Sequence, residues 1–154
     1  YILFNYIKQV LGCKMNVDRK KEMTFMPFVK VSYMENAYDT ESLASVSQTI
    51  MKALMKEFQV PKKDYFQVFS SHKKEEFFYD PHYLLRHERD HRLLYIQITC
   101  GAGRTEEQKQ SLYKEIAEQL YCQLHIPKEN VFIMLIETGV ENWSFGEGLA
   151  QMIK

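Results

Sequence analysis

A single arginine, Arg104, stands at a position suited to binding an anion. It comes directly before Thr105, a typical helix N-cap, and before the acidic pair Glu106 and Glu107, which favours a helix start. A guanidinium can hold a carboxylate by two parallel hydrogen bonds, and the backbone N–H groups of the first helical turn face the same anion. The arrangement suits the carboxylate of a small acid. The alternative interpretation is a solvated arginine near a helix end.

A carboxylate and a thiol occupy similarly suggestive places. Asp64 follows the predicted end of an earlier helix, where it can orient or activate a hydroxyl group or a water molecule; satisfying a turn is its alternative role. Cys100 lies at the end of a predicted strand near Arg104. A reactive thiol is one interpretation of this cysteine, and a buried reduced cysteine is the more common one.

The sequence also contains a formal zinc-binding pattern. His87-Glu88-Arg89-Asp90-His91 is an HExxH motif, which on a helix would present two zinc ligands and a general base. Its context is poor, because a strand is predicted to begin directly after His91 and the preceding segment is short and interrupted by Pro81. We therefore expect His72, His82, His87 and His91 to be polar residues of a long loop between two halves of the chain, and we expect neither a metal nor a cofactor.

The composition excludes several classes of protein. The chain has 154 residues, enough for one domain with a core of its own, and its 20 Lys and Arg balance its 20 Asp and Glu. This balance argues against a nucleic-acid partner. The longest wholly apolar run, residues 131–136, is too short to span a membrane. Three widely spaced cysteines without a CxxC pair indicate no disulfide framework and no thiolate zinc site, so we expect a cytoplasmic protein.

An internal repeat supplies the elements that must position the candidate residues. Pro61 recurs 66 positions later as Pro127, and residues 27–71 align without a gap with residues 93–137. Each copy contains a β-rich run, a helical segment with one apolar face, and a closing strand. The apolar positions of the two helical segments correspond: Val46, Ile50, Leu54 and Phe58 in the first copy, and Leu112, Ile116, Leu120 and Leu124 in the second.

The repeat predicts the fold. We expect an α/β (α+β) domain in which two β-α-β units with right-handed crossovers form a four-stranded mixed sheet, with both helices on one face. The strands around residues 94–98 and 131–136 are apolar on both sides of the pleat, and strands of this kind need cover on both faces. The rest of the chain is too short to cover the second face. A homo-oligomer is therefore predicted.

Four motifs occur in order along residues 26–149. They are Met26-Pro27 at the start of the repeat, Val60-Pro61-Lys62-Lys63-Asp64 after the first helix, Gly103-Arg104-Thr105-Glu106-Glu107-Gln108-Lys109 at the second helix, and Glu141-Asn142-Trp143-Ser144-Phe145-Gly146 near the end. In this order, within a two-fold repeat, the motifs resemble the tautomerase superfamily. They are most similar to its fused-repeat branch, which includes malonate semialdehyde decarboxylase.

The resemblance implies a homotrimer whose sheets line a central barrel-like core. It also implies a catalytic proline that becomes the N-terminal residue when the initiator methionine is removed, and by motif match this residue is Pro27. Asp64 would assist it, Arg104 would hold the carboxylate of a small substrate, and Trp143 and Phe145 would wall the pocket. Without the resemblance, Pro27 reads as a proline that starts a strand.

The activity that the resemblance implies is cofactor-independent keto–enol tautomerisation of small 2-oxo and 2-hydroxy acids, with the N-terminal proline as general base. A free α-amino group has a pKa of about 7.7–8.0, and an apolar pocket with a cation nearby lowers it toward neutrality, where the amine is an effective base. The decarboxylase branch has two arginines before the second helix, whereas this sequence has only Arg104 there. Tautomerisation needs one anion anchor and one base. The alternatives are a decarboxylase or hydratase of a small oxo acid such as malonate semialdehyde, or a non-catalytic trimer.

Residues 1–26 precede the proposed catalytic proline, and an amide nitrogen is not a base. The stretch from Lys20 to Met26 can be encoded with a ribosome-binding sequence a short distance before the Met26 codon, so we interpret this extension as a leader or a mis-assigned start. The alternative is a genuine arm that packs on a neighbouring subunit. The tautomerase-like domain then spans residues 27–154: the first repeat (27–71), a linker loop (72–92), the second repeat (93–137) and a C-terminal segment (138–154).

Overall fold

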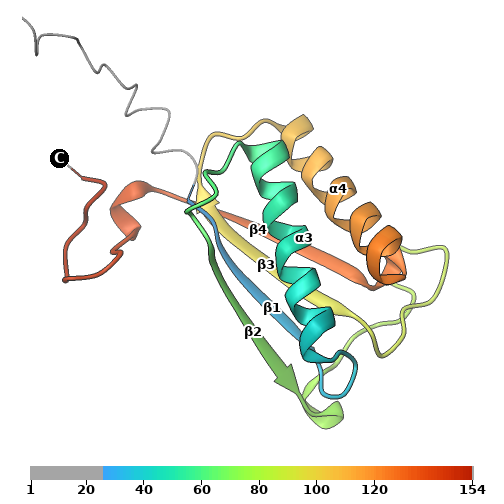
Figure 1. The fold of residues 1–154 in the computed structure, drawn as a ribbon. Coiled ribbons are helices and arrows are strands. Elements are labelled where there is room, and N and C mark those ends of the chain that lie inside the picture. The colour runs from blue at the N-terminus through green and yellow to red at the C-terminus, as the bar shows by residue number, and fades with distance from the viewer. Residues whose placement is uncertain (1–25, 154) are drawn as a thin grey trace, which may run out of the picture.

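The computed structural model describes residues 26–153, so the predicted extension lies almost wholly outside the described residues. In this described part of the chain the long elements are β1 (Phe28–Met34), α3 (Thr40–Phe58), β2 (Phe66–His72), β3 (Leu94–Gly101), α4 (Glu106–Leu124) and β4 (Val131–Thr138). Three short 3-10 helices lie between or after them: η1 (Lys74–Glu76), η2 (Lys128–Asn130) and η3 (Val140–Asn142). Both long helices lie on the same face of the sheet (Figure 1).

The sheet has the strand order β2-β1-β3-β4. Strands β1 and β2 are parallel and are joined through α3. Strands β3 and β4 are likewise parallel and are joined through α4. The two pairs meet where β1 runs antiparallel to β3. This is a four-stranded mixed sheet built from two β-α-β units, so the predicted fold class is confirmed.

The helices repeat as closely as the sequence does. Both contain 19 residues, and their first residues, Thr40 and Glu106, keep the offset of 66. Asp39 and Thr105 cap the helix starts by accepting hydrogen bonds from backbone N–H groups three residues ahead, which satisfies donors that the helix leaves unpaired. Each helix ends at a residue with left-handed backbone geometry, Gln59 or His125, two residues before the proline of its repeat.

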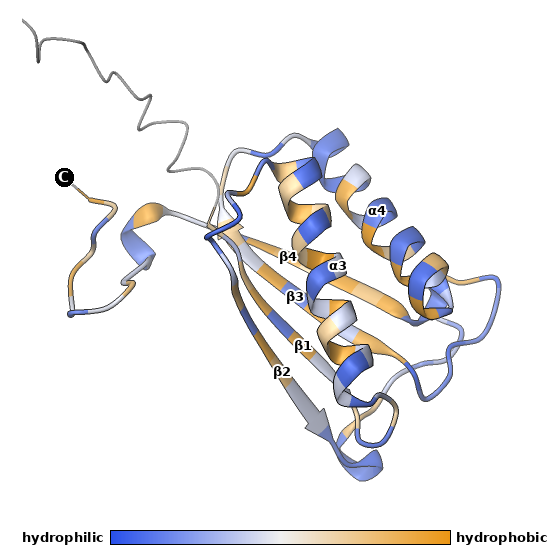
Figure 2. Ribbon diagram, viewed as in Figure 1, coloured by the Kyte–Doolittle hydropathy of each residue, from blue (hydrophilic) through white to orange (hydrophobic). Residues whose placement is uncertain are grey.

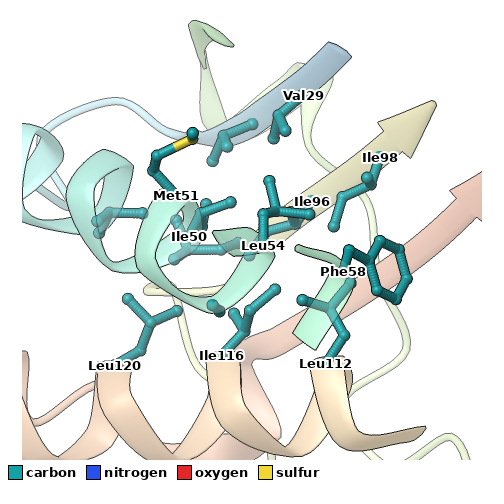
Figure 3. Close-up of a cluster of buried hydrophobic side chains, with 14 of the residues drawn as sticks. Val29, Ile50, Met51, Leu54, Phe58, Ile96, Ile98, Leu112, Ile116 and Leu120 are labelled. Carbon is teal, nitrogen blue, oxygen red and sulfur yellow. The ribbon is translucent and has the colours of Figure 1, made fainter. Parts of the chain in front are cut away.

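The core lies between the sheet and the helices. Phe58, Leu54 and Ile50 of α3 pack beside Leu112, Ile116 and Leu120 of α4 in antiparallel order, as Figure 3 shows. Val29 and Val31 of β1 and the alternate residues Leu94, Ile96 and Ile98 of β3 cover this layer on the side of the sheet. Each fully buried aliphatic side chain of this kind contributes about 1.5–3 kcal/mol. Leu124, predicted for the same stripe, is only partly buried at its edge.

The opposite face of the sheet is uncovered in the single chain. Side chains alternate across a strand, so the neighbours of the core residues point to this face. They include large apolar side chains that remain 37–50% exposed: Phe28, Phe66, Val68, Phe132, Met134 and Ile136. Figure 2 shows β4 as hydrophobic along most of its length, although only one of its faces meets the helices. This is the uncovered apolar face that the sequence predicted.

The HExxH pattern does not lie on a helix. Residues 86–91 have no regular secondary structure, and no group of three metal-binding side chains gathers anywhere in residues 26–153. Two residues of the motif instead fasten the linker. Asp90 exchanges hydrogen bonds with buried Asn130, and the Arg89 side chain donates to the carbonyl groups of Glu129 and Asp80. His82, His87 and His91 lie in the loop as predicted, whereas the prediction is wrong for His72, which is the last residue of β2. Within the described part of the chain, no helix combines the length and apolar character that crossing a bilayer requires.

Candidate active site

The strand directions bring the four predicted motifs to one edge of the sheet. Because β1 is antiparallel to β3, the starts of β1 and β2 lie beside the ends of β3 and β4: Phe28 pairs with Phe66 and with Thr99, and Gly101 pairs with Thr138. Every candidate residue lies within seven positions of one of these paired residues along the chain. The candidates are Pro27, Asp64, Arg104, Trp143 and Phe145.

A small aromatic cavity opens at this edge. It has a volume of about 240 Å³ and is lined by Met26, Pro27, Phe28, Phe66, Trp143, Ser144 and Phe145. The Trp143 and Phe145 rings are stacked, with centroids 5.7 Å apart and an interplanar angle of 8°, and the Phe145 ring lies 6.4 Å from that of Phe66. The structure therefore brings together three of the five predicted residues. The volume is below the usual range for drug-sized ligands and suits a small molecule.

Four cavity residues were not predicted as site residues: Met26 and Ser144, which are chain neighbours of predicted ones, and the two phenylalanines Phe28 and Phe66. Phe28 and Phe66 are cross-strand partners at the starts of β1 and β2, and both point to the uncovered face. The signal that identifies Phe28 is the alternation of β1, because buried Val29 and Val31 place Phe28 and Lys30 on the other face. Phe66 then follows from the parallel register of β2 with β1. That register is a tertiary property, which no pattern within one strand shows.

The segment after β4 carries the two predicted aromatic residues. Asn142 donates from its amide to Thr138 Oγ1 at 2.7 Å, which fastens η3 to the strand end. The Gln151 side chain then bridges the loop: its amide oxygen accepts from the Phe145 N–H at 3.0 Å, and its amide nitrogen donates to the Gly146 carbonyl at 2.8 Å. Gly146 has a φ of 135°, a conformation that side chains disfavour. These contacts fix Phe145 against Phe66.

Arg104 is buried rather than solvated. Only 6% of the residue is exposed, and its guanidinium lies 4.9 Å from the centre of the Phe58 ring and donates to the Gly101 carbonyl. Burial lowers the pKa of Arg104, but a guanidinium stays charged at any physiological pH. The interpretation of Arg104 as a solvated residue is wrong. Its side chain lies on the helix side of the edge and is not part of the cavity lining.

Asp64 lies in the turn that leads into β2. Its N–H donates to the Pro61 carbonyl at 2.9 Å, and the residue is half-buried. It stands two residues before Phe66, at the same edge as Pro27, and is likewise outside the cavity lining. The backbone thus has the turn that the alternative interpretation expected. The role of the Asp64 carboxylate stays a prediction.

Cys100 is fully buried on the helix side of β3. Desolvation raises the pKa of its thiol, although the charge of Arg104 opposes that shift. A thiol with a raised pKa is protonated at neutral pH and is a poor nucleophile. Cys100 is therefore a core residue, in agreement with the more common of its two interpretations.

Comparisons with known proteins fit this architecture. Residues 64–146 match a family model described as tautomerase enzyme. A probable tautomerase of Bacillus subtilis (strain 168), YusQ, is 45% identical over 129 residues, which cover 84% of this chain and all of that protein. The chain belongs to the tautomerase family. A second probable tautomerase of the same organism, YrdN, is 27% identical over 128 residues, covering 83% of this chain and 97% of the relative.

Solved structures with the same fold include a member of the fused-repeat branch that the motifs indicated. The structure of malonate semialdehyde decarboxylase superimposes with a TM-score of 0.74 at 25% identity, covering 81% of this chain and 95% of that chain. A fused 4-OT protein that forms an asymmetric trimer shares the fold, with a TM-score of 0.64 at 18% identity over 80% of this chain and 96% of its own. The expected superfamily and its decarboxylase-like neighbours are thus confirmed, while the roles of the individual residues stay predictions.

Proposed function

We propose that this tautomerase-family enzyme is a cofactor-independent keto–enol tautomerase of small 2-oxo and 2-hydroxy acids, acting in the cytoplasm with Pro27 as its general base. The observation that carries the proposal is the position of Pro27. It is buried at the start of β1, in a cavity whose other walls are mostly aromatic. The working domain in this proposal begins at Pro27, because the nitrogen of an internal residue is an amide and cannot accept a proton at neutral pH.

The surroundings of Pro27 favour a neutral amine. The cavity walls are apolar, and desolvation disfavours the protonated form of an amine. Cys100 lies across from Pro27, because Phe28 pairs with Thr99, and the charged Arg104 follows four residues later. Apolar walls and a nearby cation both lower the pKa of an α-amino group from about 7.7–8.0. An amine with a pKa near 7 can both take up and release a proton during one turnover.

The proposed reaction moves one proton within the substrate and consumes nothing else. In the enol-to-keto direction, the neutral Pro27 amine takes up the proton of the 2-hydroxyl group, and the ammonium formed in this way delivers that proton to C3. The 2-oxo group forms as the C2–C3 double bond becomes single, and the amine is left neutral again. Asp64 would orient the hydroxyl group or a water molecule during this transfer. Arg104 would hold the substrate carboxylate at the start of α4, where the anion would compete with the Gly101 carbonyl for the guanidinium.

Self-association as a homotrimer is part of the proposal. The uncovered face of the sheet exposes six large apolar side chains, and an exposed apolar patch of this kind is typical of a protein–protein interface. Packing these faces around a common axis would bury them, and the fused 4-OT neighbour is described as a trimer. Measuring the mass of the native assembly by light scattering tests this part independently of any activity.

The catalytic proposal is tested with three matched proteins: a chain that begins at Pro27, the same chain with Pro27→Ala, and the full 154-residue chain. Conversion of the enol of an aromatic 2-oxo acid to its keto form is followed by absorbance. We expect activity above buffer only for the first protein. Pro81→Ala, a change in the linker, serves as the control for loss of a proline, and mass spectrometry verifies each N-terminus.

Two results would refute the mechanism. If the chain beginning at Pro27 is no faster than buffer, it is not a tautomerase of such acids, and the non-catalytic trimer becomes the better interpretation. If the full-length chain is equally active, the base is not a free Pro27 amine. The intact mass of the protein purified from its native source shows whether the chain there begins at Pro27 or at an upstream residue.

Decarboxylation or hydration of a small oxo acid is the second candidate. It is favoured by the structural similarity to malonate semialdehyde decarboxylase, whose structure superimposes with a TM-score of 0.74. Supplying malonate semialdehyde to the chain beginning at Pro27 and measuring carbon dioxide release separates this reaction from tautomerisation. Release faster than the turnover of the aromatic enol would favour the decarboxylase.

A further inference from the structure

Glu137 lies next to the loop that carries Arg104. It occupies β4 directly opposite Cys100 of β3, and the next pair in this register is Gly101 with Thr138. From Gly101 the chain leaves the sheet and reaches α4 through residues 102–105, with Gly103 at a φ of 111°. The connection is therefore short and irregular, and no strand or helix fixes the backbone of Arg104.

The Glu137 carboxylate ties this loop to its surroundings. It accepts a hydrogen bond from Lys109 Nζ at 2.8 Å, and the two side chains are only 28% and 27% exposed. Lys109 belongs to the start of α4, where its own N–H donates to the Thr105 carbonyl at 3.1 Å. The Lys109 ammonium, followed by the backbone N–H groups of Arg104 and Gly103, lowers the pKa of Glu137. The Glu137 carboxylate thus links the end of β4 to the loop and to the start of α4.

The fold alone does not require this pair. In the first repeat, the residues 66 positions earlier are Ser71 in place of Glu137 and Leu43 in place of Lys109. The same strand-to-helix connection forms there with an equivalent helix, starting at the corresponding residue, and without a charged pair at these positions. The residue that corresponds to Arg104 is Tyr38. The Glu137–Lys109 pair therefore occurs only in the repeat that contains the arginine, although both repeats share the same topology.

We propose that Glu137, held by Lys109, is a positioning residue that fixes the 102–105 loop so that Arg104 can bind the carboxylate of the substrate. The proposal rests on the proposed role of Arg104 as the carboxylate anchor. Glu137 does not itself touch the substrate. Its contribution is to remove the freedom that the loop would otherwise lose on binding, and ordering a segment in advance increases affinity.

The test uses binding rather than turnover. Trp143 is the single tryptophan of the chain and lines the aromatic cavity, so its fluorescence reports ligand binding there. The 154-residue chain is titrated with 2-oxohexanoate and, separately, with its methyl ester, which lacks the carboxylate. We expect Glu137→Ala to weaken binding of the acid about tenfold, the scale of one lost hydrogen bond to a charged group, and to leave ester binding unchanged. Glu137→Gln keeps one acceptor oxygen and should lose less.

Two controls separate positioning from general damage. Lys56→Met breaks another charged contact, between Lys56 and Glu115 at 2.6 Å, which joins α3 to α4 away from the loop, and it should leave acid binding unchanged. In a background that already carries Arg104→Ala, Glu137→Ala should cause no further loss for the acid, because two residues that act through one contact are not additive.

Several results would overturn the inference. They are an unchanged affinity in Glu137→Ala, an equal loss for the acid and the ester, a full additional loss in the Arg104→Ala background, or no binding of the acid by the unaltered chain. The outcome is separable from that of the proposed function. If the chain binds the acid as described but does not tautomerise it, the proposed reaction is refuted and the positioning role of Glu137 stands. If the chain is active but Glu137→Ala leaves acid binding unchanged, the positioning role is refuted and the proposed reaction stands.

Discussion

Replacing Asn130 with alanine should destabilise the protein more than most polar substitutions would. Asn130 is completely buried, its amide oxygen accepts from the Asp90 N–H at 2.9 Å, and its amide nitrogen donates to the Asp90 carboxylate at 2.6 Å. A neutral hydrogen bond contributes about 1 kcal/mol and one to a charged group about 1.5–3 kcal/mol. Asp90 has a side chain that is 40% exposed, so water can replace part of the second bond and its contribution must be discounted.

We therefore expect Asn130→Ala to lower the free energy of unfolding by about 2 kcal/mol, which corresponds to a fall in melting temperature of roughly 6–10 °C for a domain of this size. Urea unfolding measures the change, at one protein concentration because association adds to apparent stability. Asn142→Ala is the matched control, since Asn142 is exposed and makes one side-chain hydrogen bond, to Thr138. A loss no larger than that of Asn142→Ala would show that the Asp90–Asn130 contact does not hold the linker.

Four further outcomes are expected. Asp39→Ala removes the oxygen that caps α3 and should lower the urea midpoint, whereas Asp39→Ser should restore most of it. Phe66→Ala removes one cavity wall and should weaken binding of 2-oxohexanoate about tenfold, read from tryptophan fluorescence. Met134→Glu places a charge on the uncovered face and should dissociate the oligomer, as sedimentation would show. The lowered pKa of Glu137 means that its ion pair stabilises the fold above the ordinary glutamate pKa of about 4.3 and ceases to do so as the pH falls through the lowered value; Glu137→Gln should flatten this part of the stability profile.

The fold could be predicted because its information is local and repeated. A four-residue apolar spacing, an N-cap and an X-Pro stop occur twice at a fixed offset, so each copy supports the assignment of the other. The apolar residues on both sides of the strands around 94–98 and 131–136 also predicted that one face of the sheet would stay apolar and uncovered. These features depend on neighbours within one element, and the structure agrees with them at Asp39, Thr105 and the two helix ends.

The candidate site was less accessible to prediction, because it depends on contacts between elements. The positions of Pro27, Trp143 and Phe145 follow from strand order, and the structure brings these residues to one cavity. The direction of the Arg104 side chain does not follow in this way. It is set by the Phe58 ring at the end of α3, more than forty residues earlier, and by the carbonyl of Gly101. The sequence therefore indicated an arginine at the right edge but not its burial.

The two-fold repeat raises the question of why the domain would have one site rather than two. The counterpart of the Pro27 cavity exists at the opposite edge: Leu93, Phe132 and Tyr79, which lie 66 positions from Pro27, Phe66 and Phe145 in the sequence, line a cavity of about 120 Å³, half the volume of the first.

The linker closes this second cavity. Arg89 lines it and is held there by the Asp80 and Glu129 carbonyl groups, while Asp90 binds Asn130, the counterpart of Asp64. Leu93 is an internal residue with no free amine, and Tyr38 stands in place of Arg104. The second copy thus lacks the base and the counterpart of Arg104, and its cavity has half the volume. Duplication of the fold produced two similar edges, and the proposed chemistry requires residues that only one of them has.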